Sequence, residues 1–359
     1  MATVVLAGGG TAGHIEPALA VARAWKLVHP LDEMVFIGTK AGLENKLVPS
    51  AGFTLAHIPK VQISRRPSLS WFRIPVDLFY AVASSRKILK DAQLLIGFGG
   101  YVSAPAYLAA RIVKTPILIH EANAKPGWAN RLGAKLTPYL AVANHVDKGN
   151  FAKALITGLP LRSDVSQAFM ASRLDFPAAR QAAKRRLGFA DNKPLVFIMG
   201  GSQGSLAINK VVEESLPQLL ARGISILHSI GRLNSLPKKV DGYRPVAYVD
   251  AMGDAYLASD LIISRSGAVT CSEFRTLGRY ALFVPLPIGN GEQFYNARSL
   301  IEESRAEVVE QSNFNSQFLV AHIDNLLKNA AASQVDGSDA DLVAAEKIVA
   351  FGEFAVSQQ

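Results

Sequence analysis

Short apolar segments alternate with stretches of helical spacing along the whole chain of 359 residues. Strands that alternate with helices form parallel sheets, and the connecting helices cover both faces of each sheet. The alternation therefore predicts an α/β protein built from doubly wound sheets. The predicted strands lie at 4–7, 35–38, 54–58, 94–98, 117–120, 140–143 and 155–157, and at 195–199, 225–230, 246–249, 261–264, 282–284 and 307–309.

A chain of this length is expected to form about two domains, at roughly 150 residues for each. The alternating pattern is interrupted after Pro160 by a polar, helix-prone region that extends to Gly188. We therefore predict domains at 1–161 and 162–337. The tail at 338–355 has helical spacing, which by itself fits either domain.

The composition limits the class of protein and its partners. Apolar residues make up 49% of the chain and charged residues 19%, which indicates a packed globular protein. The net charge of +9 favours polyanionic partners: nucleic acid, an anionic membrane surface or a phosphorylated substrate. With no leader segment and no apolar run near the ~18 residues that span a bilayer, we expect a cytosolic or peripheral protein. A single cysteine, Cys271, excludes an internal disulfide and a multi-cysteine metal site.

The loop after the first predicted strand is rich in glycine from Gly8 to Gly13 and ends on His14. Pro17 is expected in the first turn of the following helix, where its missing N–H costs nothing. Such a helix start can bind an anion through its N–H groups and dipole. The glycine spacing also fits a dinucleotide turn, but the second strand, 34–39, ends without the carboxylate that would hold a ribose. A glycine turn without a ligand stays an alternative.

Two further glycine loops, 97–103 and 200–205, also follow predicted strands. Three such loops at equivalent strand ends favour ligand sites over simple turns. Ser202 and nearby N–H groups are suited to a phosphate, and Gly99 and Gly100 would let a pyrophosphate approach the backbone. No metal-binding pattern emerges, so we expect backbone N–H groups and arginine to neutralise phosphate charge.

Polar residues follow other predicted strands. His120 and Glu121 are adjacent and should point to opposite sides, so His120 is either an acid/base group or buried support. Asn123 lies just beyond this strand, where it can bind an amide or hydroxyl. Glu273 is either a ribose ligand or a solvated helix charge. Carboxamides in the segment 287–296 are typical of sugar recognition, because one side chain both donates and accepts.

The stretch 60–80 mixes cations with large apolar side chains around prolines. Arginines beside aromatic rings suit a membrane interface, where the rings lie at headgroup level and the cations meet anionic lipid. A solvated loop that packs its rings on its own domain is the alternative. The residues concerned are Arg65, Arg66, Trp71, Phe72 and Arg73.

Taken in order, these motifs resemble those of the MurG family of UDP-N-acetylglucosamine transferases over nearly the full length. The resemblance rests on the loops 8–14, 97–103 and 200–204, the segments 120–123 and 265–273, and Glu292, Gln293 and Asn296. It implies a GT-B glycosyltransferase with two Rossmann-like domains facing a central cleft, the tail helix 338–355 returning to the first. It also implies inverting, metal-independent transfer of GlcNAc from UDP-GlcNAc to the C4 hydroxyl of MurNAc in lipid I, without a cofactor.

The resemblance also implies site residues and partners. His14 would be the catalytic base, or would only orient phosphate. The donor site would comprise Thr11, Ala12, Gly13, Asn123, Arg162, Ser202, Val249, Ala268, Val269, Thr270, Glu273, Gln293 and Asn296, with uracil near Val249 and ribose on Glu273. The acceptor pyrophosphate would lie on Gly10, Gly99, Gly100 and Tyr101. The partners would be UDP-GlcNAc, lipid I and the anionic cytoplasmic face of the cell membrane, with no nucleic acid.

Three positions depart from the family pattern. Leu159 stands where asparagine is usual, Glu292 replaces one of two paired glutamines, and Ala12 replaces a glycine. Another GT-B enzyme acting on a UDP-sugar, either a glycolipid glycosyltransferase or a UDP-sugar epimerase, is the main alternative. A Rossmann protein that uses NAD is the second, weakened by the missing ribose carboxylate.

Overall fold

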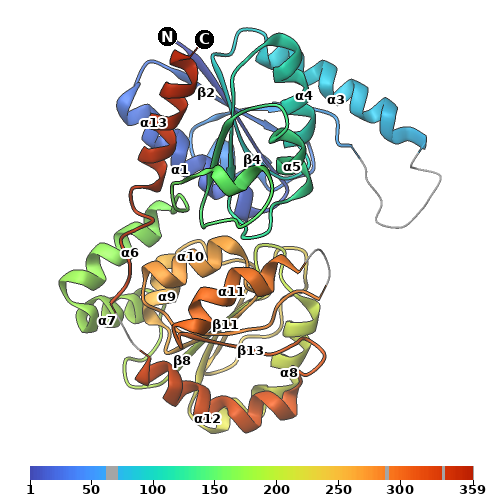
Figure 1. Ribbon diagram of the computed structural model, residues 1–359. Coiled ribbons are helices and arrows are strands. Elements are labelled where there is room, and N and C mark those ends of the chain that lie inside the picture. The colour runs from blue at the N-terminus through green and yellow to red at the C-terminus, as the bar shows by residue number, and fades with distance from the viewer. Residues whose placement is uncertain (62–71, 288–290, 334–335, 359) are drawn as a thin grey trace. The chain divides into compact units, whose positions relative to one another are not determined.

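The computed structural model describes residues 1–61, 72–287, 291–333 and 336–358. The chain divides into two compact units, of which unit 1 holds Met1–Arg162 and Asp341–Gln359 and unit 2 holds Ser163–Ala340 (Figure 1). We describe each unit by itself.

Unit 1 is a seven-stranded sheet of order β3-β2-β1-β4-β5-β6-β7, in which the described strand pairs are parallel. The order reverses between β1 and β4, and ligands of doubly wound sheets bind at the carboxyl ends of the strands beside such a reversal. Its strands are β1 (Thr3–Gly8), β2 (Glu33–Gly38), β3 (Thr54–His57), β4 (Leu94–Gly99), β5 (Ile117–Glu121), β6 (Tyr139–Val142) and β7 (Leu155–Ile156). Its helices are α1 (Ala12–Val28), α2 (Glu44–Ser50), α3 (Ile74–Leu89), α4 (Ser103–Val113), α5 (Trp128–Gly133) and α13 (Ala344–Ser357), with a 3₁₀ turn, η2 (Asn150–Lys153).

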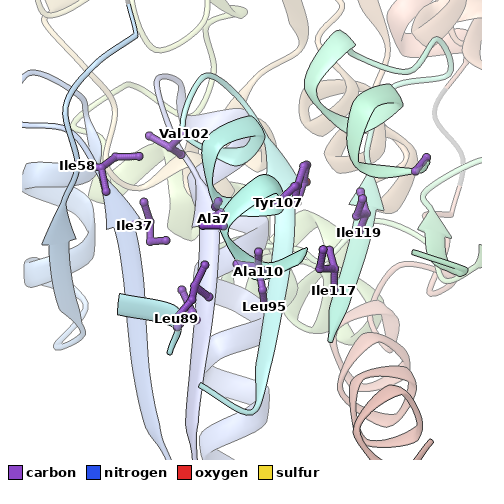
Figure 2. Close-up of a cluster of buried hydrophobic side chains, with 14 of the residues drawn as sticks. Ala7, Ile37, Ile58, Leu89, Leu95, Val102, Tyr107, Ala110, Ile117 and Ile119 are labelled. Atoms are coloured by element: carbon purple, nitrogen blue, oxygen red, sulfur yellow. The ribbon is translucent and has the colours of Figure 1, made fainter. Parts of the chain in front are cut away.

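The strands of unit 1 are apolar on both faces, because helices cover both. Alternate residues of β1 separate into two cores, with Val5 and Ala7 in one and Val4 and Leu6 in the other. The first core packs under α3 and α4, and the second packs under α1 and α13. Figure 2 shows the first core, with Ala7, Ile37, Leu95, Ile117 and Ile119 of the strands near Tyr107 and Ala110 of α4.

The last helix belongs to unit 1 and lies beside α1 (Figure 1). Ile348 and Val349 of α13 share a core with Trp25 of α1. Asp341, just before this helix, is buried and accepts a hydrogen bond from the N–H of Leu159 at 3.0 Å. Leu159, one of the three departures from the family pattern, is itself fully buried.

Unit 2 is a six-stranded parallel sheet of order β10-β9-β8-β11-β12-β13. One core packs under α8 and α12, while Phe197, Tyr256, Phe274 and Phe283 form a chain of ring contacts. Its strands are β8 (Leu195–Met199), β9 (Ser225–Ser229), β10 (Tyr243–Val246), β11 (Leu261–Ser264), β12 (Ala281–Phe283) and β13 (Ala306–Val308). Its helices are α6 (Ser163–Leu174), α7 (Phe176–Arg186), α8 (Leu206–Ala221), α9 (Met252–Ala258), α10 (Ala268–Thr276), α11 (Glu292–Glu302) and α12 (Ser316–Ala332).

The structure confirms the α/β class and a strand at or within two residues of each predicted position except one. The strand predicted at 246–249 lies at Tyr243–Val246 instead, because Tyr243 is the buried residue that anchors it to β9. Pro245 is tolerated there since β10 is an edge strand.

The prediction for Pro17 was also wrong. The helix already begins at Ala12, directly after the glycine turn, so Pro17 lies inside it.

Candidate active site

His14 lies at the carboxyl end of the unit 1 sheet, in the first turn of α1. The hydroxyl of Thr11, the N-cap residue, is 3.4 Å from Nδ1 of His14 and does not cap the helix. The same Nδ1 is 3.2 Å from the carbonyl oxygen of Gly9. A carbonyl oxygen only accepts hydrogen bonds, so in the neutral imidazole Nδ1 carries the hydrogen and Nε2 keeps a lone pair.

The surroundings of His14 favour this neutral form. Burial lowers the pKa of His14 below its usual value, and it outweighs the charge of Glu121 and the bond to Gly9, which both raise that pKa. The side chain is nevertheless only partly buried. His14 can therefore accept a proton at neutral pH.

Nε2 of His14 lies beside the second glycine loop, since a Cβ atom at Gly99 would be 3.4 Å from it. The first and second loops touch, and a Cβ at Gly100 would be 2.3 Å from the carbonyl oxygen of Gly9. Gly100 also has a φ of +84°, which side chains rarely allow. A larger residue there would separate the two loops.

Glu121, the last residue of β5, is buried and accepts hydrogen bonds through both carboxylate oxygens. Oε1 accepts from the backbone N–H and the side-chain amide of Asn123, at 2.9 and 3.0 Å. Oε2 accepts from the N–H of Gly127 and the amide of Asn130, at 2.9 and 3.0 Å. Tyr107 donates to the amide oxygen of Asn130 at 2.7 Å, which fixes the orientation of that amide. Glu121 therefore holds Asn123 and the loop after β5 in place.

His120 points away from Glu121, as the two-residue period of a strand requires. Its Nε2 is 2.9 Å from the carbonyl oxygen of Gly158, and the side chain is 1% exposed. Burial lowers the pKa of His120 to about 4. Of the two alternatives left open by the sequence, buried support is the one that this geometry fits.

A carboxylate that the sequence does not reveal lies near the end of β2. Glu44, the first residue of α2, is fully buried and accepts hydrogen bonds from the N–H groups of Gly10 at 3.2 Å and Thr39 at 3.0 Å. Tyr101 donates its hydroxyl to the same carboxylate at 2.7 Å. Gly10 and Tyr101 were both expected to contact the acceptor, and the N–H of Gly10 and the hydroxyl of Tyr101 are bound to Glu44. Asn130 and Tyr107 are likewise missed by sequence reasoning, because neither carries a local motif.

In unit 2, Arg265 joins the loops at the carboxyl ends of neighbouring strands. Its buried guanidinium donates to the carbonyl oxygens of Val284 and Pro285, at 2.7 and 3.0 Å, and to the side chains of Ser205 and Gln311, at 2.8 and 2.6 Å. Arg265 therefore holds the start of α8 beside the end of β12. Both terminal nitrogens of the guanidinium thus donate to protein acceptors.

The start of α10 is suited to an anion. Its N-cap residue is Gly267, which has no side chain with which to cap the helix. The first helical residues, Ala268, Val269 and Thr270, are partly exposed. Glu273, further along the helix, is 2% exposed and accepts a hydrogen bond from Tyr256 at 2.7 Å. The alternative of a solvated helix charge is therefore wrong for Glu273.

Of the remaining predicted donor residues of unit 2, Ser202 and Val249 lie in loops after strands, whereas Gln293 and Asn296 lie in the first turns of α11, where a loop was expected. The amide oxygen of Gln293 accepts from the N–H of Leu286 at 2.9 Å, and the amide of Asn296 donates to the carbonyl oxygen of Ser266 at 3.3 Å. These bonds join the start of α11 to the ends of β11 and β12. Ser202 lies partly buried after β8, and Val249 is buried after β10.

The predicted donor residues are divided between the two units. Thr11, Ala12, Gly13, Asn123 and Arg162 belong to unit 1, and the others belong to unit 2.

The predicted membrane-facing residues Arg65, Arg66 and Trp71 lie outside the described residues. Phe72 and Arg73 are described and are exposed, as are Phe79 and Tyr80 on α3. Among the helices that the structure describes, none has both the length and the apolar character needed to cross a bilayer. The same described residues contain no group of three or more histidine, cysteine, aspartate or glutamate side chains placed to hold a metal ion.

Comparison with known proteins identifies the family. The models of the N-terminal and C-terminal domains of glycosyltransferase family 28 match residues 4–141 and 195–350. The UDP-N-acetylglucosamine–N-acetylmuramyl-(pentapeptide) pyrophosphoryl-undecaprenol N-acetylglucosamine transferase of Corynebacterium glutamicum strain R is 43% identical over 327 residues, covering 90% of this chain and 89% of that protein.

Solved structures show the same architecture. The crystal structure of Acinetobacter baumannii MurG has a TM-score of 0.70 and 26% identity, covering 99% of this chain and 100% of that one. The UDP-GlcNAc 2-epimerase of Neisseria meningitidis has a TM-score of 0.59 at 14% identity, covering 98% of this chain and 99% of that one, and shares the fold alone.

Two doubly wound α/β units with glycine loops at the carboxyl ends of their strands define the GT-B class of glycosyltransferases. The chain belongs to glycosyltransferase family 28 and, within it, to the MurG family.

Proposed function

We propose that this protein transfers GlcNAc from UDP-GlcNAc to the C4 hydroxyl of MurNAc in lipid I, giving lipid II for peptidoglycan synthesis. The 43% identity to a transferase named for this donor and acceptor supports the assignment. In the reaction the C4 oxygen bonds to C1 of GlcNAc, the bond from C1 to the UDP oxygen breaks with inversion, and the hydroxyl proton passes to a base.

The observation that carries the mechanism is the hydrogen bond between His14 and Gly9. It leaves Nε2 of a neutral imidazole as the atom able to take the C4 proton. Glu121 favours the imidazolium that forms, because its negative charge raises the pKa of His14. The loops around Gly99 and Gly100 would hold the acceptor pyrophosphate beside this ring.

In our proposal the donor nucleotide binds unit 2. The N–H groups at the start of α10 and the loop with Ser202 would stabilise the negative charge that develops on the leaving diphosphate. Glu273 would accept hydrogen bonds from the ribose hydroxyls, and Val249 would lie against uracil. Gln293 and Asn296, together with Asn123 of unit 1, would bind the GlcNAc hydroxyls. Thr11, Ala12, Gly13 and Arg162 would contact the diphosphate.

We further propose that α3 brings the enzyme to the cytoplasmic face of the membrane, where its lipid acceptor lies. Ile74, Leu78 and Val82 pack one face of α3 on the core, yet Val76 and Phe79 on the other side are 54% and 68% exposed. Phe72, just before α3, is 82% exposed and is followed by Arg73. An exposed apolar stripe beside cations is typical of binding to an anionic lipid surface.

Flotation with liposomes tests this attachment. The double change Phe72→Ser and Phe79→Ser should lower the fraction bound to anionic vesicles, while the matched changes Met170→Ser and Leu174→Ser, at exposed positions of α6, should not. Equal binding by all variants would leave α3 as an ordinary solvated surface.

The reaction is tested by supplying purified protein with UDP-GlcNAc and lipid I and identifying the lipid product by mass spectrometry. We expect lipid II, and much weaker turnover of UDP-glucose. Release of UDP with formation of a 2-epimer and no lipid product would indicate an epimerase instead. Saturable binding of NAD in place of UDP-GlcNAc would contradict the proposal altogether.

A further inference from the structure

The peptide unit that joins Gly9 to Gly10 is held from both sides. Its carbonyl oxygen, on Gly9, lies 3.2 Å from Nδ1 of His14. Its N–H, on Gly10, donates to Oε2 of Glu44 at 3.2 Å. The N–H and C=O of a trans peptide point in opposite directions within one rigid plane, so turning one end turns the other. The orientation of the carbonyl that binds His14 is therefore coupled to Glu44.

Glu44 is itself fixed by groups that follow two other strands, β2 and β4, which lie on either side of β1 in the sheet. Its Oε1 accepts from the N–H of Thr39 at 3.0 Å, after β2, and from the hydroxyl of Tyr101 at 2.7 Å, after β4. Thr39 also lies 3.0 Å from the Tyr101 hydroxyl. Burial raises the pKa of Tyr101 to about 12, so its hydroxyl stays protonated and able to donate at neutral pH.

Packing supports the same arrangement. A Cβ atom at Gly10 would lie 2.7 Å from the ring of Tyr101, so this ring packs directly on the first glycine loop. Glu44 is completely buried between the loops. The buried carboxylate accepts from one backbone donor on each oxygen, so turning the Gly9–Gly10 peptide would leave one carboxylate oxygen without its donor.

We propose that Glu44 is a positioning residue for His14, acting through the Gly9–Gly10 peptide to hold the imidazole in the form with hydrogen on Nδ1. Glu44 does not touch the substrate. It keeps the lone pair on Nε2, beside Gly99, where the acceptor hydroxyl would be. This inference rests on the proposed function only for its kinetic consequence, because the state of the His14 ring can be observed without substrate.

Glu44→Gln tests the inference with little change in shape. A glutamine amide accepts at one end only, so its NH₂ group must face the N–H of either Gly10 or Thr39. One of the two backbone donors then loses its acceptor. The matched control is Glu307→Gln in unit 2, because Glu307 also accepts from a tyrosine, Tyr280, and from Asn329 at 2.8 Å.

The first measurement is the ¹⁵N spectrum of histidine-labelled protein, with the His14 signals assigned by comparison with His14→Gln. We expect wild type and Glu307→Gln to show neutral His14 with hydrogen on Nδ1, and Glu44→Gln to show a mixture of the two neutral forms. An unchanged His14 signal in Glu44→Gln, or the same change in Glu307→Gln, would overturn the inference. If Glu44→Gln does not fold, Tyr101→Phe removes one donor to Glu44 and is expected to give the same change in smaller degree.

The second measurement is a double-mutant cycle on kcat. We expect Glu44→Gln to lower kcat about 10-fold or more with the KM for UDP-GlcNAc within twofold of wild type, and to have little further effect when His14 is already alanine. If the loss of kcat in the double variant equals the product of the losses in the two single variants, Glu44 acts independently of His14. Failure of wild type to form lipid II would contradict the proposed function, while the spectrum would still decide the role of Glu44.

Discussion

Asn130 donates its side-chain amide to Glu121 at 3.0 Å, and both residues are buried at the carboxyl edge of the unit 1 sheet. Tyr107 binds the other end of the same amide, so the amide cannot turn over without losing both bonds. The loop that carries Asn123 is thereby tied to α4 and α5. This network of buried hydrogen bonds holds Glu121, whose charge acts on His14, in a fixed position.

We therefore predict that Asn130→Asp, which replaces the donor by a carboxylate, destabilises the protein by about 2–4 kcal/mol, because a buried acceptor then faces Glu121. Urea unfolding measures this loss. The matched control is Asn329→Asp, where the amide donates to Glu307 at an exposed site. Solvent screens the repulsion there, so the cost should stay below about 1 kcal/mol. Equal costs at the two sites would argue against the buried network.

His14→Ala should lower kcat by about 100-fold or more, because a general base contributes on this scale. The affinity for UDP, measured by titration calorimetry, should stay within about twofold of wild type, because a base that acts on the acceptor hydroxyl makes no contact with UDP. Turnover near the wild-type value at saturating donor would remove His14 as the base and leave it as a phosphate ligand.

The pH dependence of kcat/KM should reflect the lowered pKa of His14. A base works in its deprotonated form, so activity is lost as the pH falls through the pKa of His14. Because that pKa lies below its usual value of about 6.5, the acid limb should also lie below pH 6.5. A profile from pH 5 to 8 checks this, and an acid limb above pH 7 would contradict it.

Glu273→Ala should raise the dissociation constant of UDP about 10- to 100-fold. This is the change expected because the variant loses charge-assisted hydrogen bonds to the ribose hydroxyls. Tyr256→Phe, which removes the hydroxyl that holds Glu273, should weaken UDP in the same direction but less. Tyr243→Phe is the control, since that buried hydroxyl contacts His228 instead. Unchanged affinity in Glu273→Ala would place the ribose elsewhere.

The stability of the folded chain should decrease in mild acid because two buried histidines resist protonation. Burial lowers the pKa of His120 to about 4 and that of His228 to about 3. Below pH 6.5 the unfolded chain takes up these protons first, so the free energy of unfolding decreases by about 1 kcal/mol per pH unit for each residue. The full stability is present above pH 6.5. Urea unfolding at pH 7, 6 and 5 should show a shallower loss in His228→Gln, and an equal loss would exclude His228 as a cause.

The strands and glycine loops could be predicted because their signals are local. The run Val4–Ala7 is apolar on every residue, which a strand with both faces buried requires, and the glycines after it indicate a turn close to another backbone. Pro17 shows the limit of this reasoning. Local preference places a proline in the first turn of a helix, yet α1 begins at Ala12 and holds Pro17 at its sixth position, where the proline lacks an N–H for the helical hydrogen bond.

The sequence by itself determined the α/β class, the parallel sheets and the motifs at their carboxyl ends, since each of these depends on neighbours in the chain. The tertiary structure alone decided which polar groups meet. Glu44 accepts hydrogen bonds from Gly10 and Tyr101, and Asn130 donates to Glu121. Arg265 donates to both Ser205 and Val284. Glu44 and Tyr101 are 57 positions apart, and Arg265 and Ser205 are 60 apart. A buried polar group takes whichever partners the fold brings within hydrogen-bond distance, and no local pattern records which those are.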